Sequence, residues 1–204
     1  MAKIKLTKNE LKKQKDALKM FQRYLPTLIL KKQQLQMEIR LTEIRLAELN
    51  DEKGRLNESF RPWIAVFGEK GFFTPDILKI TSIKTGQGNI AGVNIPIFEG
   101  AEFEMRSYDL ARIPLWVDLA VEKLKHVFLL DLEAQIVEEQ RRRLSHELSI
   151  TTQRVNLFEK VKIPETRENI KKIQVYLGDQ QTAAVVRGKI AKQGLVKAAQ
   201  RGGA

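Results

Sequence analysis

The chain of 204 residues contains no cysteine, which excludes disulfides and thiolate metal sites. Aromatic residues make up only 7% of the sequence and charged residues 30%, a composition typical of long exposed helices rather than of a compact globule. No apolar run approaches the roughly 20 residues that a helix needs to cross a bilayer. The first residues also lack the apolar core of a signal peptide. We therefore expect a cytoplasmic protein without membrane insertion.

A seven-residue apolar repeat is the dominant pattern, and it runs from Leu11 to Phe60 and again from Val127 to Phe158. This spacing makes helices wind around each other. The sequence therefore predicts a fold dominated by α-helix, a long antiparallel two-helix coiled coil with both termini at one end. Arg141 and Thr151 interrupt the second repeat. The predicted seam consists of Leu11, Leu18, Leu28, Leu35, Ile39, Leu46, Leu49, Leu56, Val127, Leu130, Val137, Leu144, Leu148, Val155 and Phe158.

Local signals mark where the two helices begin and where they are disturbed. Thr7 and Glu10 have the spacing of a capping box at the start of the first helix. Proline lacks a backbone N–H and clashes with the preceding turn, so we expect Pro26 to kink the first helix near Arg23 or Tyr24, and Pro164 to bend or break the second. The expected organisation is an N-terminal coiled-coil helix over 1–60, a connecting region over 61–112 with a β-hairpin at about 77–98, a C-terminal coiled-coil helix over 113–177, and a basic C-terminal tip or tail over 178–204.

The connecting region has the pattern of a β-hairpin. Residues 77–83 are β-rich, Thr85–Asn89 has the composition of a turn, and apolar residues alternate from Ile90 to Phe98. A lone hairpin is marginal in water, so this one must pack on its own coil or on a partner. Its apolar residues supply more apolar surface than two strands can cover: Ile80, Ile83, Val93, Ile95 and Ile97.

Positive charge is concentrated at the two ends of the chain, whose net charge is +11. Residues 1–32 hold ten lysines and arginines against two acids, and residues 180–204 hold five basic residues and no acid. An antiparallel coil brings both basic segments to the same end. They are either solvated tails or a charged end that is drawn to an acidic partner or to nucleic acid.

The sequence offers no catalytic constellation. His126 and His146 lie twenty residues apart on one predicted helix, about 30 Å, and cannot share a metal ion. Gly188-Lys189 lacks the hydroxyl residue and the upstream glycine of a phosphate-binding loop. We therefore expect that the chain is not an enzyme and has no catalytic, cofactor-binding or metal-binding residues.

The C-terminal half contains, in order, Gln153-Arg154-Val155-Asn156, Ile163-Pro164 and the apolar and basic residues 170–173. Together these segments resemble the carboxy-terminal signature of the D subunit of the V/A-type rotary ATPases. The opening helix of that family resembles residues 6–12, and its central hairpin resembles residues 89–96. The segments occur in the same order as in the family.

The resemblance implies the central rotor shaft of an ion-translocating ATPase. Such a shaft couples ATP hydrolysis or synthesis in a catalytic ring to the movement of protons or sodium ions through a membrane ring. Its implied partners are the F subunit, the hexameric ring of catalytic A and regulatory B subunits, and a funnel-shaped central-stalk subunit. It would be cytoplasmic and peripheral to the membrane, with no cofactor, no nucleic acid and no obligate homo-oligomer.

Two groups of residues are then assigned to partners. The five apolar residues of the hairpin would bind the F subunit. A basic cluster occurs where the family places one, and it would contact the catalytic ring rather than nucleotide: Arg187, Lys189 and Lys192.

Two alternative functions fit the same pattern. A prefoldin-like chaperone also joins two helices through β-hairpins, but it needs apolar ends to hold unfolded clients, and these ends are basic. A nucleic-acid-binding coiled coil would use the basic end for phosphates. Against this second alternative, few aromatic residues lie among the basic ones.

Overall fold

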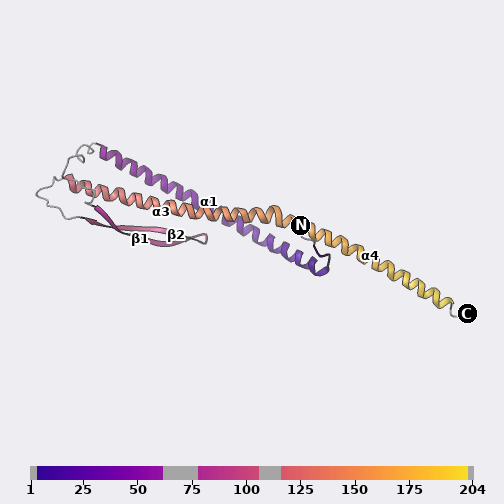
Figure 1. Ribbon diagram of the computed structural model, residues 1–204. Helices are drawn as coiled ribbons and strands as arrows, with labels where there is room; N and C mark the ends of the chain where they lie inside the picture. The colour runs from indigo at the N-terminus through magenta and orange to yellow at the C-terminus, as the bar shows by residue number, and fades with distance from the viewer. Residues whose placement is uncertain (1–3, 62–77, 106–115, 202–204) are drawn as a thin grey trace. The chain divides into compact units, whose positions relative to one another are not determined.

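The computed structural model describes residues 4–61, 78–105 and 116–201, and the side chains of these residues as far as Lys197. Two long helical segments pack antiparallel, and a β-hairpin is inserted between them in the sequence, so the predicted fold class is confirmed (Figure 1). The elements are α1 (Lys8–Phe60), β1 (Leu78–Ile90), β2 (Val93–Met105), α3 (Trp116–Asn156), the π-helix η3 (Leu157–Lys162) and α4 (Ile163–Arg201).

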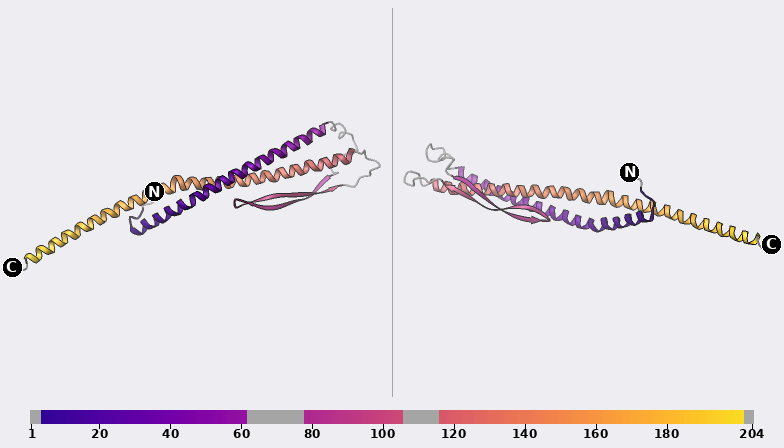
Figure 2. Two further views of the ribbon diagram at one scale, coloured as in Figure 1. Left: turned by 180° about the vertical axis from the view of Figure 1, so that it is seen from behind. Right: turned by 60° about the horizontal axis from the view of Figure 1, so that its bottom comes forward.

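The chain divides into two compact units, of which the first is Lys31–Thr151. It contains the later part of α1, the hairpin and most of α3. The hairpin lies along α3 in all three views (Figures 1 and 2). The core of this unit consists of three small clusters, formed by Leu78, Val117 and Val121, by Leu35, Ile95 and Leu144, and by Leu49, Leu130 and Val137.

The second unit combines Met1–Leu30 with Thr152–Ala204. The rings of Phe21 and Phe158 meet in it, with their centroids 5.1 Å apart. Two of its buried residues are polar, Thr166 and Asn169. The other three are apolar: Val155, Ile163 and Ile173. This part of the coil therefore has a more polar interior than the clusters of the first unit.

The start of α1 uses half of the predicted capping box. The Glu10 backbone N–H donates to Thr7 Oγ1 at 3.3 Å, which satisfies one of the free amides of the first turn. The Glu10 carboxylate does not return to Thr7 in the described contacts but accepts a hydrogen bond from Gln14 Nε2 at 2.9 Å. The helix then continues through Pro26 to Phe60.

The helix is not broken at Pro164, although its hydrogen-bond pattern changes just before that residue. Over Leu157–Lys162 the chain forms a π-helix, and the Ile163 backbone N–H donates to the Phe158 carbonyl, five residues back. Pro164 then falls in the first turn of α4. Because helical backbone precedes it, the proline removes one hydrogen bond to the preceding turn, and the change to π-helical spacing directly before it is the local adjustment that lets the helix continue. The helix continues through Gly178 and Gly188 to Arg201.

The hairpin turn lies at Ala91 and Gly92, so its predicted position at Thr85–Asn89 is wrong. The strands pair from Leu78 with Met105 to Ile90 with Val93. Ala91 and Gly92 have φ angles of 51° and 81°, and positive φ at both central residues matches the right-handed twist of a two-residue hairpin.

Gly86 and Gly88, the glycines of the predicted turn, are residues of β1, and side chains of β2 lie close over them. A Cβ atom on Gly88 would lie 2.7 Å from Cδ1 of Ile97. Such a contact is far too close, so a side chain at Gly88 would displace Ile97. The turn itself is supported by Asn89, whose Oδ1 accepts from the Gly92 backbone N–H at 3.1 Å and whose Nδ2 donates to Asn94 Oδ1 at 2.8 Å.

Candidate functional site

Three ion pairs formed by lysine or arginine join α1 to α3 and fix the register of the coil. Lys31 Nζ lies 2.7 Å from Glu147 Oε1, Arg45 Nη2 lies 2.6 Å from Glu133 Oε1, and Lys53 Nζ lies 2.5 Å from Asp131 Oδ1. The partner's number falls as the α1 number rises, as antiparallel pairing requires. The Glu133 carboxylate raises the pKa of Arg45. These side chains remain partly exposed, so each pair contributes about 0–1 kcal/mol and serves register more than stability.

All fifteen seam residues are buried or half-buried. Leu35 and Leu144 are completely buried in one cluster of the core. The buried members are Leu35, Leu49, Leu130, Val137, Leu144 and Val155, and the half-buried ones are Leu11, Leu18, Leu28, Ile39, Leu46, Leu56, Val127, Leu148 and Phe158.

The polar residues that interrupt the repeat differ in whether their side chains find a partner. Arg141 turns back to Glu138 on its own helix, with Nη2 2.5 Å from Oε1. Thr151 is 1% exposed, and its Oγ1 atom has no hydrogen-bond partner among the described residues. Thr42, in the first repeat, is buried but donates to the Ile39 carbonyl at 2.7 Å. Thr151 is therefore a local defect in an otherwise satisfied interface.

The five apolar residues of the hairpin divide into two groups. Ile95 is 4% exposed and packs with Leu35 and Leu144, and Val93 packs against the same cluster. The other three are exposed, with relative accessibilities of 41% for Ile80, 47% for Ile83 and 43% for Ile97. The coil thus covers two of the five residues and leaves three available.

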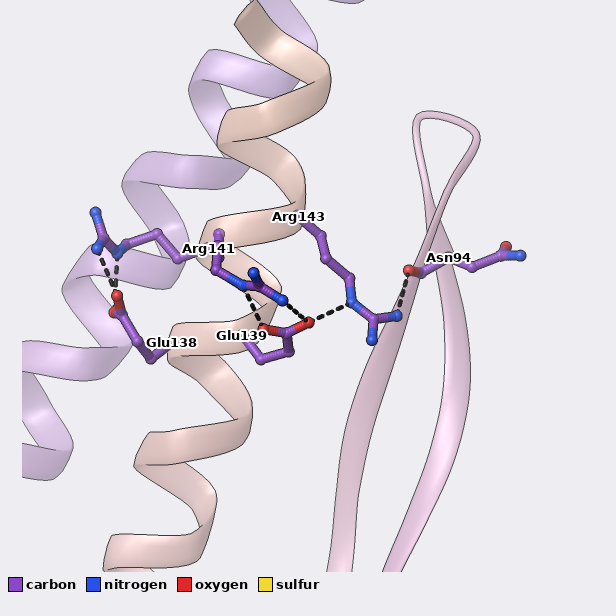
Figure 3. A network of polar contacts seen from close by, with 6 residues as sticks. Asn94, Glu138, Glu139, Arg141 and Arg143 are labelled. Carbon is purple, nitrogen blue, oxygen red and sulfur yellow. Dashed lines mark hydrogen bonds and ion pairs between the residues drawn. The ribbon is translucent and has the colours of Figure 1, made fainter.

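Two polar side chains of α3 bind the main chain of β2, and Figure 3 shows one of them, Arg143. Gln140 Nε2 donates to the Pro96 carbonyl at 2.5 Å, and Arg143 Nη1 donates to the Asn94 carbonyl at 3.2 Å. Neither residue was predicted from the sequence, because a side chain that binds a main-chain carbonyl leaves no pattern in the partner's side chains.

The basic cluster of the C-terminal segment is exposed on α4. Arg187, Lys189 and Lys192 are all exposed. Among residues 174–197 no side chain is buried. Exposed apolar residues that were not predicted from the sequence lie between and beyond the basic ones: Val185, Val186, Ile190, Leu195 and Val196.

An exposed apolar stripe on α1 was also missed. Met37, Leu41 and Ile44 are 65%, 49% and 51% exposed and are spaced by four and three residues, so they share one side of the helix. In the part of the chain that the structure describes, there is no group of three or more residues suited to hold a metal ion. No described helix is both long and apolar enough to span a bilayer.

Comparisons with known proteins agree along almost the whole chain. The family described as the D subunit of ATP synthase matches residues 10–193. The chain is 56% identical over 197 residues to the D subunit of the V-type ATP synthase of Borreliella burgdorferi, with 97% of each protein covered. It is 35% identical to the proteins of the same name from Chlamydia pneumoniae and Chlamydia muridarum, which match 93% of this chain and cover 92% and 95% of their own lengths.

A long antiparallel coil held in register by ion pairs, with a hairpin beside it, together with these relatives, defines a stalk subunit of an ion-transporting ATPase. The chain belongs to the family of D subunits of V-type ATP synthases. It is the central stalk subunit, a non-catalytic member of the V-type ATPase complex. Of the three functions considered from the sequence, the rotary ATPase is therefore the one that holds.

Proposed function

We propose that the chain is the rotating shaft that couples ATP turnover in a ring of A and B subunits to ion movement through a membrane ring, with the F subunit bound to the hairpin. A funnel-shaped subunit would link the shaft to the membrane ring. The docking proposal rests on the exposed apolar residues of the hairpin. Ile95 is covered by the coil, whereas Ile80 and Ile83 are exposed. Exposed branched apolar residues on a two-stranded sheet are expected to gain stability by burial against a partner.

Replacing the exposed hairpin residues tests where the F subunit binds. In the triple variant Ile80→Ser, Ile83→Ser, Ile97→Ser, we expect the F subunit to be lost from the purified complex while helical circular dichroism is retained. The matched control replaces Met37, Leu41 and Ile44 with serine, because these residues are at least as exposed but lie on α1. Equal retention of the F subunit by both triple variants would contradict the docking assignment, as would normal binding after deletion of residues 77–98.

The exposed end of α4 supports a contact with the inner wall of the catalytic ring. Arg187, Lys189 and Lys192 carry the charge, and exposed apolar residues such as Ile190 and Leu195 lie among them. Single charge neutralisations should have little effect, because exposed ion pairs are each worth below about 1 kcal/mol.

Truncation after Leu177 tests the role of the α4 end in rotation. It removes the charge and the apolar surface together, and it leaves every buried residue of the described chain in place. We expect assembly or ATP-driven rotation of the rebuilt complex to fall, with the unfolding temperature of the isolated shaft unchanged. Rotation and ATP turnover at the full-length level would show that this segment is only a solvated tail.

A further inference from the structure

The hairpin is anchored to the helices at two separate places. Near its base, Leu78 is buried with Val117 and Val121, and Phe103 packs against this cluster. Near its turn, Ile95 is buried with residues of both long helices. Between the two anchors the strand register shifts twice, between Ile80 and Ser82 and between Lys84 and Thr85. The second shift lies opposite Gly100, whose φ of 143° is open mainly to glycine. This bulge separates a turn half, residues 85–98, from the base of the hairpin.

Two side chains of α3 flank the buried Ile95 and bind the carbonyl groups on either side of it. Gln140 Nε2 donates to the Pro96 carbonyl at 2.5 Å, and Arg143 Nη1 donates to the Asn94 carbonyl at 3.2 Å. Three consecutive residues of β2 are therefore held by one face of α3. Because both acceptors are main-chain atoms, the attachment fixes where the strand lies whatever side chains the strand carries.

Arg143 is held in place by a carboxylate on its own helix. Its Nε atom donates to Glu139 Oε1 at 2.8 Å, and Arg142 donates to the same carboxylate through Nε at 2.7 Å and Nη2 at 2.9 Å (Figure 3). Arg142 differs from Arg143 in its exposure and in its hydrogen-bond partners. Its side chain is 75% exposed, and its hydrogen bonds within the described chain go to Glu139 and not to the hairpin.

We propose that Gln140 and Arg143 are positioning residues that hold the turn half of the hairpin against α3 and so fix where its exposed isoleucines meet a partner. The second clause rests on the proposed binding of the F subunit to the hairpin, whereas the first does not. Loss of either donor leaves a β2 carbonyl without its partner and frees the turn half to move about the bulge. The base of the hairpin keeps its own anchor.

Hydrogen exchange of the full-length chain tests the positioning role directly. Arg143→Ala and Gln140→Glu, which keeps the size of the side chain but removes its donor, should raise amide exchange in residues 85–98 about tenfold. Exchange in residues 116–151 and helical circular dichroism should not change. Arg142→Ala is the matched control, since it removes a neighbouring guanidinium that shares Glu139, and Arg143→Lys should restore part of the protection. Unchanged exchange in both test variants, or an equal rise in Arg142→Ala, would overturn the proposal.

Affinity for the F subunit of the same ATPase separates the two clauses. If Arg143→Ala raises exchange and weakens binding of the F subunit while Arg142→Ala does neither, both the positioning role and the docking site are supported. If exchange rises and binding is unchanged, the positioning role stands and the docking assignment on the hairpin fails. If exchange is unchanged, Gln140 and Arg143 do not position the hairpin, whatever the binding result.

Discussion

Phe21 of α1 and Phe158 of η3 hold their rings 5.1 Å apart at an angle of 52°, a tilted arrangement typical of aromatic pairs. Both belong to the unit formed by the two ends of the chain. Phe21→Ala should lower the stability of this unit by up to about 3 kcal/mol, since half-buried apolar area and the ring contact are lost together. Phe21→Leu should lose less. Hydrogen exchange of residues 8–30 measures the effect, and equal protection in the alanine variant would contradict it.

Leu46 tests the packing of the coil. It packs against the cluster of Leu49, Leu130 and Val137. Leu46→Asp should cost several kcal/mol, because an unpaired carboxylate would be placed in an apolar interface. Leu41→Asp is the matched control on the same helix, at a residue 49% exposed, and should cost little. Thermal unfolding followed by circular dichroism compares the two, and similar losses in both would show that the cluster does not hold the helices together.

Thr151 should tolerate loss of its hydroxyl. The side chain is 1% exposed and its oxygen has no partner among the described residues, so Thr151→Val replaces an unsatisfied group with an apolar one of the same shape. We expect stability to rise by up to about 1 kcal/mol. Thr42→Val should not be stabilising, because Thr42 donates to the Ile39 carbonyl. Denaturant unfolding of both variants decides this, and a large destabilisation by Thr151→Val would reveal a hidden partner.

Glu139 should remain ionised far into the acid range. Hydrogen bonds from Arg142 and Arg143 lower its pKa from 4.5 to about 2. A carboxylate with a lowered pKa contributes stability above its unfolded pKa, and this contribution is lost as the pH falls from about 4.5 towards 2. No change is expected between pH 6 and 8. Titration of the side chain by NMR should give a low pKa that rises in Arg142→Ala and Arg143→Ala, and a value near 4.5 in the unaltered chain would refute the contact.

The pairing of the two helices was predictable because a heptad repeat is a local pattern that indicates which side of each helix is buried. The turn was not, because Gly86 and Gly88 look like turn residues in the sequence. Gly88 lies in a strand, where the Ile97 side chain covers it from the opposite strand. Strand pairing over this distance is not visible in the local composition that was used to place the turn.

The hairpin surface was predictable in composition but not in orientation. Ile95 and Ile97 are two residues apart and equally apolar, yet one is 4% and the other 43% exposed. The difference depends on Leu35 and Leu144, which come from distant parts of the chain. Likewise, the glutamine and arginine residues of α3 looked like an ordinary solvated face, since their acceptors on β2 are backbone atoms.

The π-helical turn η3 accommodates one extra residue in the seven-residue repeat of buried positions. The burial pattern repeats every seven residues on either side of residues 157–162, but across them it steps by eight, from Val155 to Ile163 and from Phe158 to Thr166. One inserted residue would otherwise rotate every later side chain by about 100° around the helix. The π-helical turn holds the inserted residue in its wider turn, so the later side chains keep their direction. Family members should therefore differ in length by single residues here more readily than elsewhere in the long helices, with the buried positions beyond Ile163 unchanged.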